Sequence, residues 1–226
     1  MILPFKNNNN NIFYEKIGAH GLENIAKSGG LATGIDVLHC KKYWQNAKYI
    51  LDVGSGYGRV IDCLLRNGYS ESIVSIERCE SLHRALHDKY LTNKKIRILK
   101  IDLHNILLSL SDLNSKKFDV ILWMWSGIAD FPPSEQSEVV CQLAKILKPN
   151  GKLIIDTMPE KVTPMMSTKM TSQRFAITLD NVTIQTYEPN ESEIMTYATM
   201  AGLSKIVKTK CVTEIGRERC LYILRF

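Results

Sequence analysis

Short apolar segments recur along the middle of the chain, and each is followed by a segment whose apolar residues are spaced as on one face of a helix. The pattern predicts strands at 49–53, 72–76, 96–101, 118–123 and 152–156. It predicts helices at 57–67, 80–90 and 134–147, the last with Ser134 as its N-cap and a stop at 149–151. Because strands that alternate with helices form right-handed βαβ units, we expect a mainly parallel sheet.

The pattern changes after residue 157. Two strand-like segments, 174–179 and 182–187, flank Asp180 and Asn181, which favour a hairpin turn. A helix at 191–201 ends before Gly202, and strands at 206–212 and 220–226 follow. We therefore expect an antiparallel strand pair at the C-terminus.

Two helical segments are expected before the first strand. Residues 12–28 carry apolar residues at helix-like intervals, interrupted by Gly18 and Gly21, and a second helix is expected at 34–44. Both could form a lid over the edge of the sheet. Residues 1–11 end in a run of asparagines, a composition typical of a disordered lead-in.

Composition narrows the class of protein. With 226 residues, 45% apolar and 23% charged, the chain suits one α/β domain, and no apolar run is long enough to span a membrane. Six scattered cysteines without a C-x-x-C pair, and an N-terminus unlike a signal peptide, favour a cytoplasmic location. The net charge of +6 is dispersed, which argues against a nucleic-acid partner. His83 and His87 lie four apart but lack partners for a metal site.

Residues 50–58 read Ile-Leu-Asp-Val-Gly-Ser-Gly-Tyr-Gly. A strand that enters a helix through a glycine-rich turn is a nucleotide-binding arrangement, because the backbone can approach the ligand and the helix start offers free N–H groups. Dinucleotide enzymes place a third glycine where this chain has Arg59; here the glycine comes one residue earlier, at Gly58. Asp52 precedes the turn, and a carboxylate there repels a pyrophosphate but attracts an ammonium group.

The pattern Asp-x-Gly-x-Gly-x-Gly resembles motif I of the class I S-adenosylmethionine-dependent methyltransferases. The resemblance covers residues 49–157 well and 191–226 loosely. It implies a Rossmann-like, doubly wound, seven-stranded, mainly parallel sheet with a C-terminal antiparallel strand pair, and S-adenosylmethionine as cofactor, with S-adenosylhomocysteine as product. The expected single domain then comprises a helical lid (12–48), a cofactor-binding core (49–157), a loop and hairpin over the acceptor site (158–190), and a closing helix and strands (191–226).

Three acids, Asp52, Glu77 and Asp102, stand at or near the ends of the first three predicted strands. Ligands of doubly wound sheets bind beyond these ends. The resemblance implies that Glu77 binds the ribose hydroxyls, that Asp102 accepts from the adenine amino group, and that the Leu103 backbone contacts the ring. The complete set of expected cofactor-binding residues is Asp52, Gly54, Ser55, Gly56, Tyr57, Glu77, Arg78, Asp102, Leu103 and Trp123.

The acceptor side is harder to assign. Trp125 lies just past the fourth predicted strand, Met158 begins a methionine-rich segment after the fifth, and Tyr14 resembles the aromatic residue of a lid helix; each could contact the acceptor or simply pack. Asp130 is a candidate general base, with an exposed loop acid as the alternative. The Pro-Pro pair that follows Phe131 does not match the motif of nucleic-acid amino-methylating enzymes and is expected to start a helix.

The sequence therefore predicts an enzyme that transfers a methyl group from S-adenosylmethionine to a small-molecule acceptor by in-line displacement, without a metal and without a membrane or nucleic-acid partner. Three alternatives stay open: a nucleic-acid or protein methyltransferase, an aminopropyl transferase on the same scaffold, and a non-catalytic interaction protein that keeps the cofactor fold.

Overall fold

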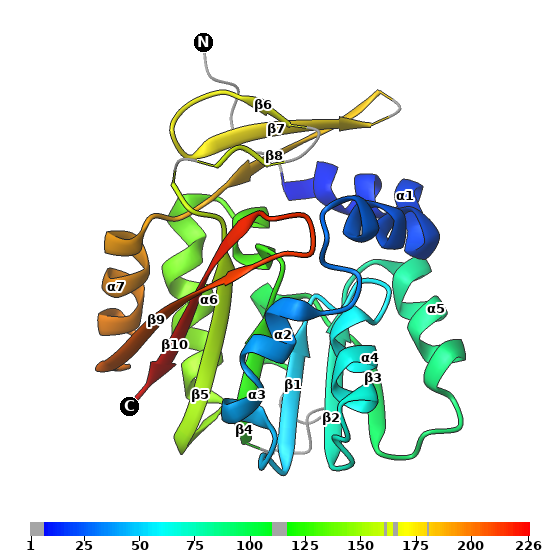
Figure 1. Ribbon diagram of the computed structural model, residues 1–226, viewed down its shortest axis with the longest axis vertical. Coiled ribbons are helices and arrows are strands. Elements are labelled where there is room, and N and C mark those ends of the chain that lie inside the picture. Colours follow the sequence, from blue (N-terminus) through cyan, green and yellow to red (C-terminus); the bar gives the residue numbers. More distant parts are fainter. Residues whose placement is uncertain (1–6, 110–116, 161, 165–166, 180) are drawn as a thin grey trace.

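The computed structural model describes residues 7–109, 117–160, 162–164, 167–179 and 181–226. Seven strands form its central sheet: β1 (Tyr49–Val53), β2 (Ser72–Glu77), β3 (Ile96–Lys100), β4 (Phe118–Trp123), β5 (Leu147–Thr157), β9 (Lys205–Val212) and β10 (Glu218–Arg225). Their spatial order is β3-β2-β1-β4-β5-β10-β9 (Figure 1). The first five pair in parallel, and β10 runs antiparallel to both of its neighbours. The predicted Rossmann-like sheet with an antiparallel C-terminal pair is confirmed.

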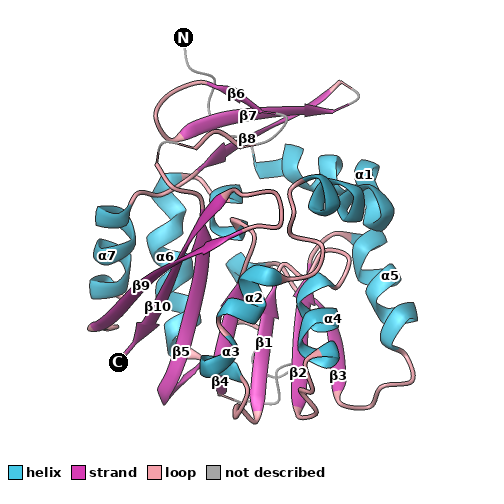
Figure 2. Ribbon diagram, in the orientation of Figure 1, coloured by secondary structure: helices cyan, strands magenta, loops and turns pink. Residues whose placement is uncertain are grey.

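Helices cover both faces of this sheet (Figure 2). They are α2 (Ile35–His39), α3 (Lys41–Trp44), α4 (Arg59–Arg66), α5 (Glu80–Tyr90), α6 (Pro133–Lys145) and α7 (Glu191–Met200), with short 3₁₀ turns η1 (Leu103–Asn105) and η2 (Gly127–Asp130). Successive residues of β1 point to opposite faces, so Ile50 packs with α2 to α5 while Leu51 packs with α6 and α7. The sheet is thus buried on both sides, as expected for parallel strands.

A helix and a second sheet lie above the carboxyl ends of the central strands (Figure 1). The helix is α1 (Asn7–Ser28), and the sheet contains β6 (Ser167–Lys169), β7 (Arg174–Leu179) and β8 (Val182–Tyr187) in that order. The predicted hairpin of β7 and β8 is present, whereas β6 was not predicted; Asp180 of its turn lies outside the described residues. Gly18 interrupts α1 with φ 62° and ψ −179°, a conformation that glycine adopts readily.

Prediction of a disordered lead-in over residues 1–11 was wrong for its second half. Helix α1 begins at Asn7, and residues 1–6 lie outside the described residues. The Asn10 side chain is fully buried, and its amide donates to the Asp130 carbonyl oxygen at 3.1 Å. A tertiary contact therefore orders an asparagine run whose composition alone favours disorder.

Several boundaries also differ from the sequence prediction. The expected helix at 34–44 is two short helices that meet at Cys40. Helix α6 begins at Pro133, so Ser134 lies inside it and is not its N-cap. Strand β5 begins at Leu147, because an irregularity in its pairing with β4 lets the Pro-Asn-Gly segment stay in the sheet.

Candidate active site

A cavity of about 290 Å³ lies at the carboxyl ends of β1 to β4, with α1 and the β7–β8 hairpin on its other side. Its lining brings together every residue that the sequence proposed for cofactor binding, acceptor binding or catalysis. These are Tyr14, Asp52, Gly54, Ser55, Gly56, Tyr57, Glu77, Arg78, Asp102, Leu103, Trp123, Trp125, Asp130 and Met158. A single cavity therefore collects side chains that lie up to 144 positions apart, from Tyr14 to Met158 (158 − 14 = 144).

The glycine-rich turn after β1 needs its three glycines for different reasons. Gly54, Gly56 and Gly58 have φ values of 67°, 56° and 91°, in the left-handed region that disfavours side chains. A Cβ on Gly54 would meet no other atom within 4 Å, whereas one on Gly58 would lie 2.5 Å from the Tyr90 hydroxyl. Gly58 thus allows the turn to pack on α5, and Gly54 leaves open space beside the backbone.

Asp52 is a buried acid at the edge of this turn. Its side chain is 1% exposed, and its Oδ2 atom has no hydrogen-bond partner among the described residues. Burial raises the pKa of its carboxyl to about 7. A buried carboxyl oxygen without a partner is costly in the protein alone, and a ligand that donates to it would remove that cost.

Glu77 crosses from the end of β2 to the glycine turn. Its two carboxyl oxygens accept from the backbone N–H groups of Gly56 and Cys79, each at 2.9 Å. Burial raises the pKa of this carboxyl, and these hydrogen bonds oppose the rise. Each oxygen has a further lone pair, so the fixed carboxyl can also accept from two ligand hydroxyls.

Asp102 follows β3 and belongs to a chain of charged groups. Its Oδ1 faces His104 Nδ1 at 2.8 Å, and His104 Nε2 lies 2.7 Å from Glu135 Oε2. Arg78 adds an ion pair to Asp102 at 3.8 Å. Burial alone would raise the pKa of Asp102, but the bonds from His104 lower it; burial would lower the pKa of His104, but its two carboxylate partners raise it. His104 looked isolated in the sequence because Glu135 is 31 positions away.

Three further cofactor candidates differ in their surroundings. Leu103 is buried at the start of η1, directly after Asp102. The Tyr57 hydroxyl is buried without a hydrogen-bond partner among the described residues. Trp123 borders the cavity but is 1% exposed and packs edge to face on Phe131, so most of its ring belongs to the core.

Helix α1 is attached to the rest of the site through polar contacts. The Tyr14 hydroxyl donates to Asp130 Oδ2 at 2.8 Å, and the Glu15 carboxylate accepts from the N–H groups of Glu80 and Ser81 at the start of α5. Burial raises the pKa of the Asp130 carboxyl to about 6, although the bond from Tyr14 opposes this. Asp130 is therefore not the exposed loop acid that the sequence left as an alternative.

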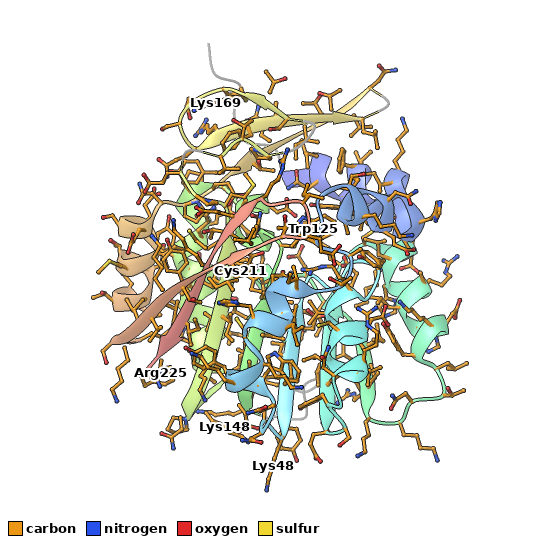
Figure 3. The ribbon with its side chains drawn as sticks, in the orientation of Figure 1. Lys48, Trp125, Lys148, Lys169, Cys211 and Arg225 are labelled. Carbon is orange, nitrogen blue, oxygen red and sulfur yellow. The ribbon has the colours of Figure 1, made fainter. Side chains whose placement is uncertain are left out.

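Trp125, labelled in Figure 3, follows β4 in a strained backbone conformation. Both Trp125 and Ser126 have φ of 54°, which is unusual for residues other than glycine. The Trp125 N–H donates to Asp156 at 2.8 Å, and its ring lies 5.6 Å from the guanidinium of Arg59. Arg59 is itself buried and paired with Asp36. In the sequence, Arg59 was notable only because dinucleotide-binding motifs have a glycine at its position. Its pairing with Asp36 could not be predicted, since Asp36 is 23 positions away.

The far side of the cavity is formed by the inner face of the second sheet. Ile177 and Leu179 of β7 and Ile184 and Thr186 of β8 line it, together with Glu188 just beyond β8. The Met158 N–H donates to Glu188 Oε2 at 3.2 Å. Sequence reasoning missed Thr186 and Glu188, although the alternation of apolar Val182 and Ile184 with polar Thr183 and Gln185 was a usable signal for the inner face.

The described part of the chain shows neither a metal-binding cluster nor a membrane-spanning helix. Among the described residues, no group of three or more His, Cys, Asp or Glu side chains is arranged to hold a metal ion. The helices of the described part of the chain are too short or too polar to cross a bilayer.

Comparisons with known proteins agree with this architecture. Residues 50–151 match a family model described as a methyltransferase domain, and no curated protein matches the chain. The CcbJ methyltransferase from Streptomyces caelestis is 14% identical, with a TM-score of 0.66 over 85% of this chain and 88% of that one.

Two other solved structures extend the comparison. The glycopeptide N-methyltransferase MtfA, in complex with S-adenosylhomocysteine, is 13% identical, with a TM-score of 0.67 over 87% of this chain and 90% of that one. The magnesium protoporphyrin IX methyltransferase from Synechocystis PCC 6803, with bound S-adenosylmethionine, is 14% identical, with a TM-score of 0.58 over 92% and 82%. At these identities the likeness establishes the fold. The domain match adds that residues 50–151 are similar to a methyltransferase domain.

Proposed function

We propose that this protein transfers the methyl group of S-adenosylmethionine to a small-molecule acceptor by in-line displacement. The observation that carries the proposal is the Oδ2 atom of Asp52, which has no hydrogen-bond partner among the described residues and belongs to a residue that lines one cavity with Glu77 and Asp102. Each of these groups can accept from a donor that the cofactor offers.

The residues of the donor half fit the cofactor chemically. Asp52 would face the ammonium of the methionine moiety, because a buried carboxylate is stabilised by a cation. Glu77, held by two backbone N–H groups, would accept from the ribose hydroxyls. Asp102 would accept from the adenine amino group through Oδ2, because its Oδ1 is already engaged by His104. Gly54, Ser55, Gly56, Tyr57, Arg78, Leu103 and Trp123 complete the proposed lining.

The cofactor, when bound, supplies a methyl group on a positively charged sulfur, which is a good leaving group. The chain's own task is then to align the acceptor and to exclude water. Helix α1 and the β7–β8 hairpin suit both tasks because their side chains line the cavity opposite the glycine turn. Tyr14, Trp125 and Met158 are proposed to contact the acceptor there, and Asp130 is a candidate to take its proton.

A small acceptor fits this arrangement better than a macromolecule does. Residues of α1, β7 and β8 line the space beyond the glycine turn, where a protein or nucleic-acid chain would have to enter. The alternative of an aminopropyl transferase is tested by competition between S-adenosylmethionine and its decarboxylated form. A non-catalytic interaction protein would bind the cofactor without turning over any acceptor.

Isothermal titration calorimetry with S-adenosylhomocysteine tests the donor half directly. We expect the wild type to bind and Glu77→Gln to lose at least about tenfold in affinity, since a hydrogen bond to a charged group is worth about 1.5–3 kcal/mol. Glutamine keeps the size of the side chain and one acceptor oxygen, so the glycine turn should stay in place.

The matched control is Glu71→Gln. Glu71 is exposed and lies just before the opposite end of β2, so the same substitution there should leave the affinity unchanged. If folded wild type does not bind S-adenosylhomocysteine, the proposed function is wrong. If Glu77→Gln binds as tightly as wild type, Glu77 has no role at the ribose.

A further inference from the structure

On the cavity side of β8, an apolar strip of side chains ends in two polar residues, Thr186 in the strand and Glu188 just beyond it. Residues 184, 186 and 188 alternate along the strand and point to the same side, where they line the cavity. Ile184 continues the apolar surface made by Ile177 and Leu179 of β7. Thr186 and Glu188 then place a hydroxyl and a carboxyl on that side.

Thr186 lacks a hydrogen-bond partner. Its side chain is 6% exposed, and its Oγ1 atom is buried without a partner among the described residues. A buried hydroxyl with no partner in the protein is uncommon, because leaving it unsatisfied costs about 1–3 kcal/mol. Since Thr186 lines the cavity, a ligand there can supply the missing partner.

Glu188 is a buried carboxyl without a direct cationic partner. It is 8% exposed, and none of the ion pairs within 4 Å among the described residues includes it. The nearby cation Arg219 is committed elsewhere: its Nε and Nη2 atoms donate to the two oxygens of Asp156 at 3.0 and 2.8 Å, and Nη2 also donates to Ser126. Asp156 therefore balances the charge of Arg219 and leaves that of Glu188 uncompensated.

The pKa of the Glu188 carboxyl agrees with an uncompensated charge. Burial raises the pKa of its carboxyl to about 7, and Arg219 and the hydrogen bonds from Ser126 and Met158 lower it only in part. Such a carboxyl becomes fully ionised at neutral pH when a cation binds beside it. An apolar strip that ends in a hydroxyl and a carboxylate is complementary to an apolar molecule with a protonated amine.

We propose that Thr186 and Glu188 are the acceptor-binding pair, and that the acceptor is an apolar molecule carrying a primary or secondary amine. This inference rests on the proposed methyl transfer and adds the class of acceptor. The ammonium group of the acceptor pairs with the Glu188 carboxylate, and a second N–H donates to Thr186 Oγ1. The apolar body lies along Ile177, Leu179 and Ile184.

The same pair accounts for the proton in the reaction. The bound ammonium gives one proton to the Glu188 carboxylate and becomes a neutral amine with a free lone pair. Its nitrogen then forms the new N–CH₃ bond, while the S–CH₃ bond breaks and its electron pair stays on sulfur. The product is a methylated ammonium and S-adenosylhomocysteine, and the proton on Glu188 passes to water when the product leaves.

Calorimetry on the protein saturated with S-adenosylhomocysteine tests the class of acceptor. Phenylbutylamine, phenylbutanol and phenylbutyrate share one apolar body and differ in an end group that is cationic, neutral or anionic. We expect the amine to bind at least about tenfold more tightly than the alcohol or the carboxylate. In Glu188→Gln this preference should disappear, and Thr186→Val should weaken amine binding by about three- to tenfold.

Two substitutions outside the cavity are matched controls. Thr183→Val makes the same change on the exposed face of β8, and Glu191→Gln makes it at an exposed position on α7. Both should keep the amine preference. Circular dichroism and S-adenosylhomocysteine affinity should be unchanged in all four variants.

Results that differ from these expectations contradict the inference or point to another residue. The inference is overturned if the saturated protein binds no amine, if the alcohol or the carboxylate binds as tightly, or if Glu188→Gln retains the preference. Preferential binding of phenylbutyrate would point to the exposed Arg217 at the cavity edge instead. Failure of the wild type to bind S-adenosylhomocysteine would overturn the proposed function itself, and the inference with it.

Discussion

Two buried aspartates, Asp52 near the end of β1 and Asp156 near the end of β5, differ in whether the protein satisfies their hydrogen bonds. This difference indicates which of them binds a ligand. Asp156 is fully buried, but both of its oxygens accept from Arg219, so the protein itself satisfies it. Asp52 is equally buried, yet its Oδ2 has no partner among the described residues. The pairing with Arg219 gives Asp156 a structural role, whereas Asp52 Oδ2 gains a hydrogen-bond partner only when a ligand binds.

Replacing Asp52 by Asn should separate stability from binding. The folded carboxyl has a pKa of about 7, above the usual value, so the wild type loses stability as the pH rises from about 4 to 7. Asn cannot ionise, and we expect Asp52→Asn to be more stable than wild type at pH 8 by roughly 1–3 kcal/mol, with a smaller difference at pH 5. Affinity for S-adenosylhomocysteine should fall at least about tenfold. Urea denaturation and calorimetry measure the two effects.

Asp119→Asn is the control for this prediction and should behave in the opposite way. Asp119 accepts from the N–H of Lys48 and from Lys148, which both lie far from the cavity-lining Trp125 in Figure 3. Burial alone would raise the pKa of Asp119, but these partners lower it, so this substitution should destabilise the fold and leave cofactor affinity unchanged. A destabilised Asp52→Asn with normal affinity would show that Asp52 is a structural residue.

Residues whose role follows from their position on a strand could be predicted from the sequence. Residues whose role depends on a partner far along the chain could not. Asp52, Glu77 and Asp102 could be predicted because each stands at or near the end of a strand with a clear apolar pattern. His104 and Arg59 could not be predicted, because their partners Glu135 and Asp36 approach only in the folded chain. The alternation along β8 could have placed Glu188 on the inner face, but the sequence could not show that Arg219 is already paired with Asp156.

At the scale of elements, the glycine turn is also a packing contact between two helices. Gly58 lies at the start of α4, and its carbonyl oxygen accepts from the Tyr90 hydroxyl of α5 at 3.1 Å. The same hydroxyl donates to Asp62 at 2.7 Å. The third glycine of the motif therefore holds α4 and α5 together behind the cavity, while the first two shape its surface.

Gly58→Ala should cost more stability than the loss of glycine's backbone freedom alone. At φ of 91° an alanine costs about 1–2 kcal/mol, and its Cβ would also lie 2.5 Å from the Tyr90 hydroxyl. We expect a total loss of about 2–4 kcal/mol in urea denaturation. Gly68→Ala isolates the backbone effect, because Gly68 has φ of 86° and open space around its Cβ position. Equal losses in the two variants would contradict a packing role for Gly58.

Elements with a strong periodic pattern were predicted well, and the rest depended on tertiary contacts. Strands β1, β4, β7 and β8 have the predicted limits, since turn residues bound each apolar run. The start of α1 was missed because the contact of Asn10 with Asp130 overrides the composition of the asparagine run. The second sheet could be predicted only as a hairpin, because β6 is three residues long and has no apolar pattern of its own.

Across the whole molecule, the cavity gathers buried carboxyls whose pKa values are raised. Burial brings Asp52 and Glu188 to about 7 and Asp130 to about 6. Asp102 and Asp119, whose hydrogen-bond partners outweigh the effect of burial, have lowered pKa values instead. Carboxyls with raised pKa values thus gather at the cavity, which is the pattern expected of a site that binds cationic ligands.

The pH dependence of the free energy of unfolding should reflect these raised and lowered pKa values. Acids with lowered pKa values stabilise the fold above about pH 4, and this contribution is lost as the pH falls through their folded pKa values. Acids with raised pKa values act in the opposite sense: the folded state holds their protons more tightly, so stability decreases as the pH rises toward 7. They are Asp52, Glu77, Asp130 and Glu188 at the cavity, and Asp156. His104, whose pKa is raised by its carboxylate partners, also loses its contribution as the pH rises. We therefore expect the free energy of unfolding to be greatest near pH 5 and to fall by about 2–5 kcal/mol by pH 8.

Urea denaturation at a series of pH values tests this profile. In the triple variant Asp52→Asn, Asp130→Asn and Glu188→Gln the decrease above pH 5 should shrink to the shares of Glu77, Asp156 and His104, while the acid side should keep its shape. A saturating mixture of S-adenosylhomocysteine and phenylbutylamine should raise wild-type stability more at pH 8 than at pH 5, because both ligands place an ammonium beside an ionised cavity acid. Wild-type stability that instead rises steadily from pH 5 to 8 would mean that water or a protein cation already neutralises the cavity carboxyls. In that case the unpaired charges on which the donor and acceptor assignments both depend would not exist.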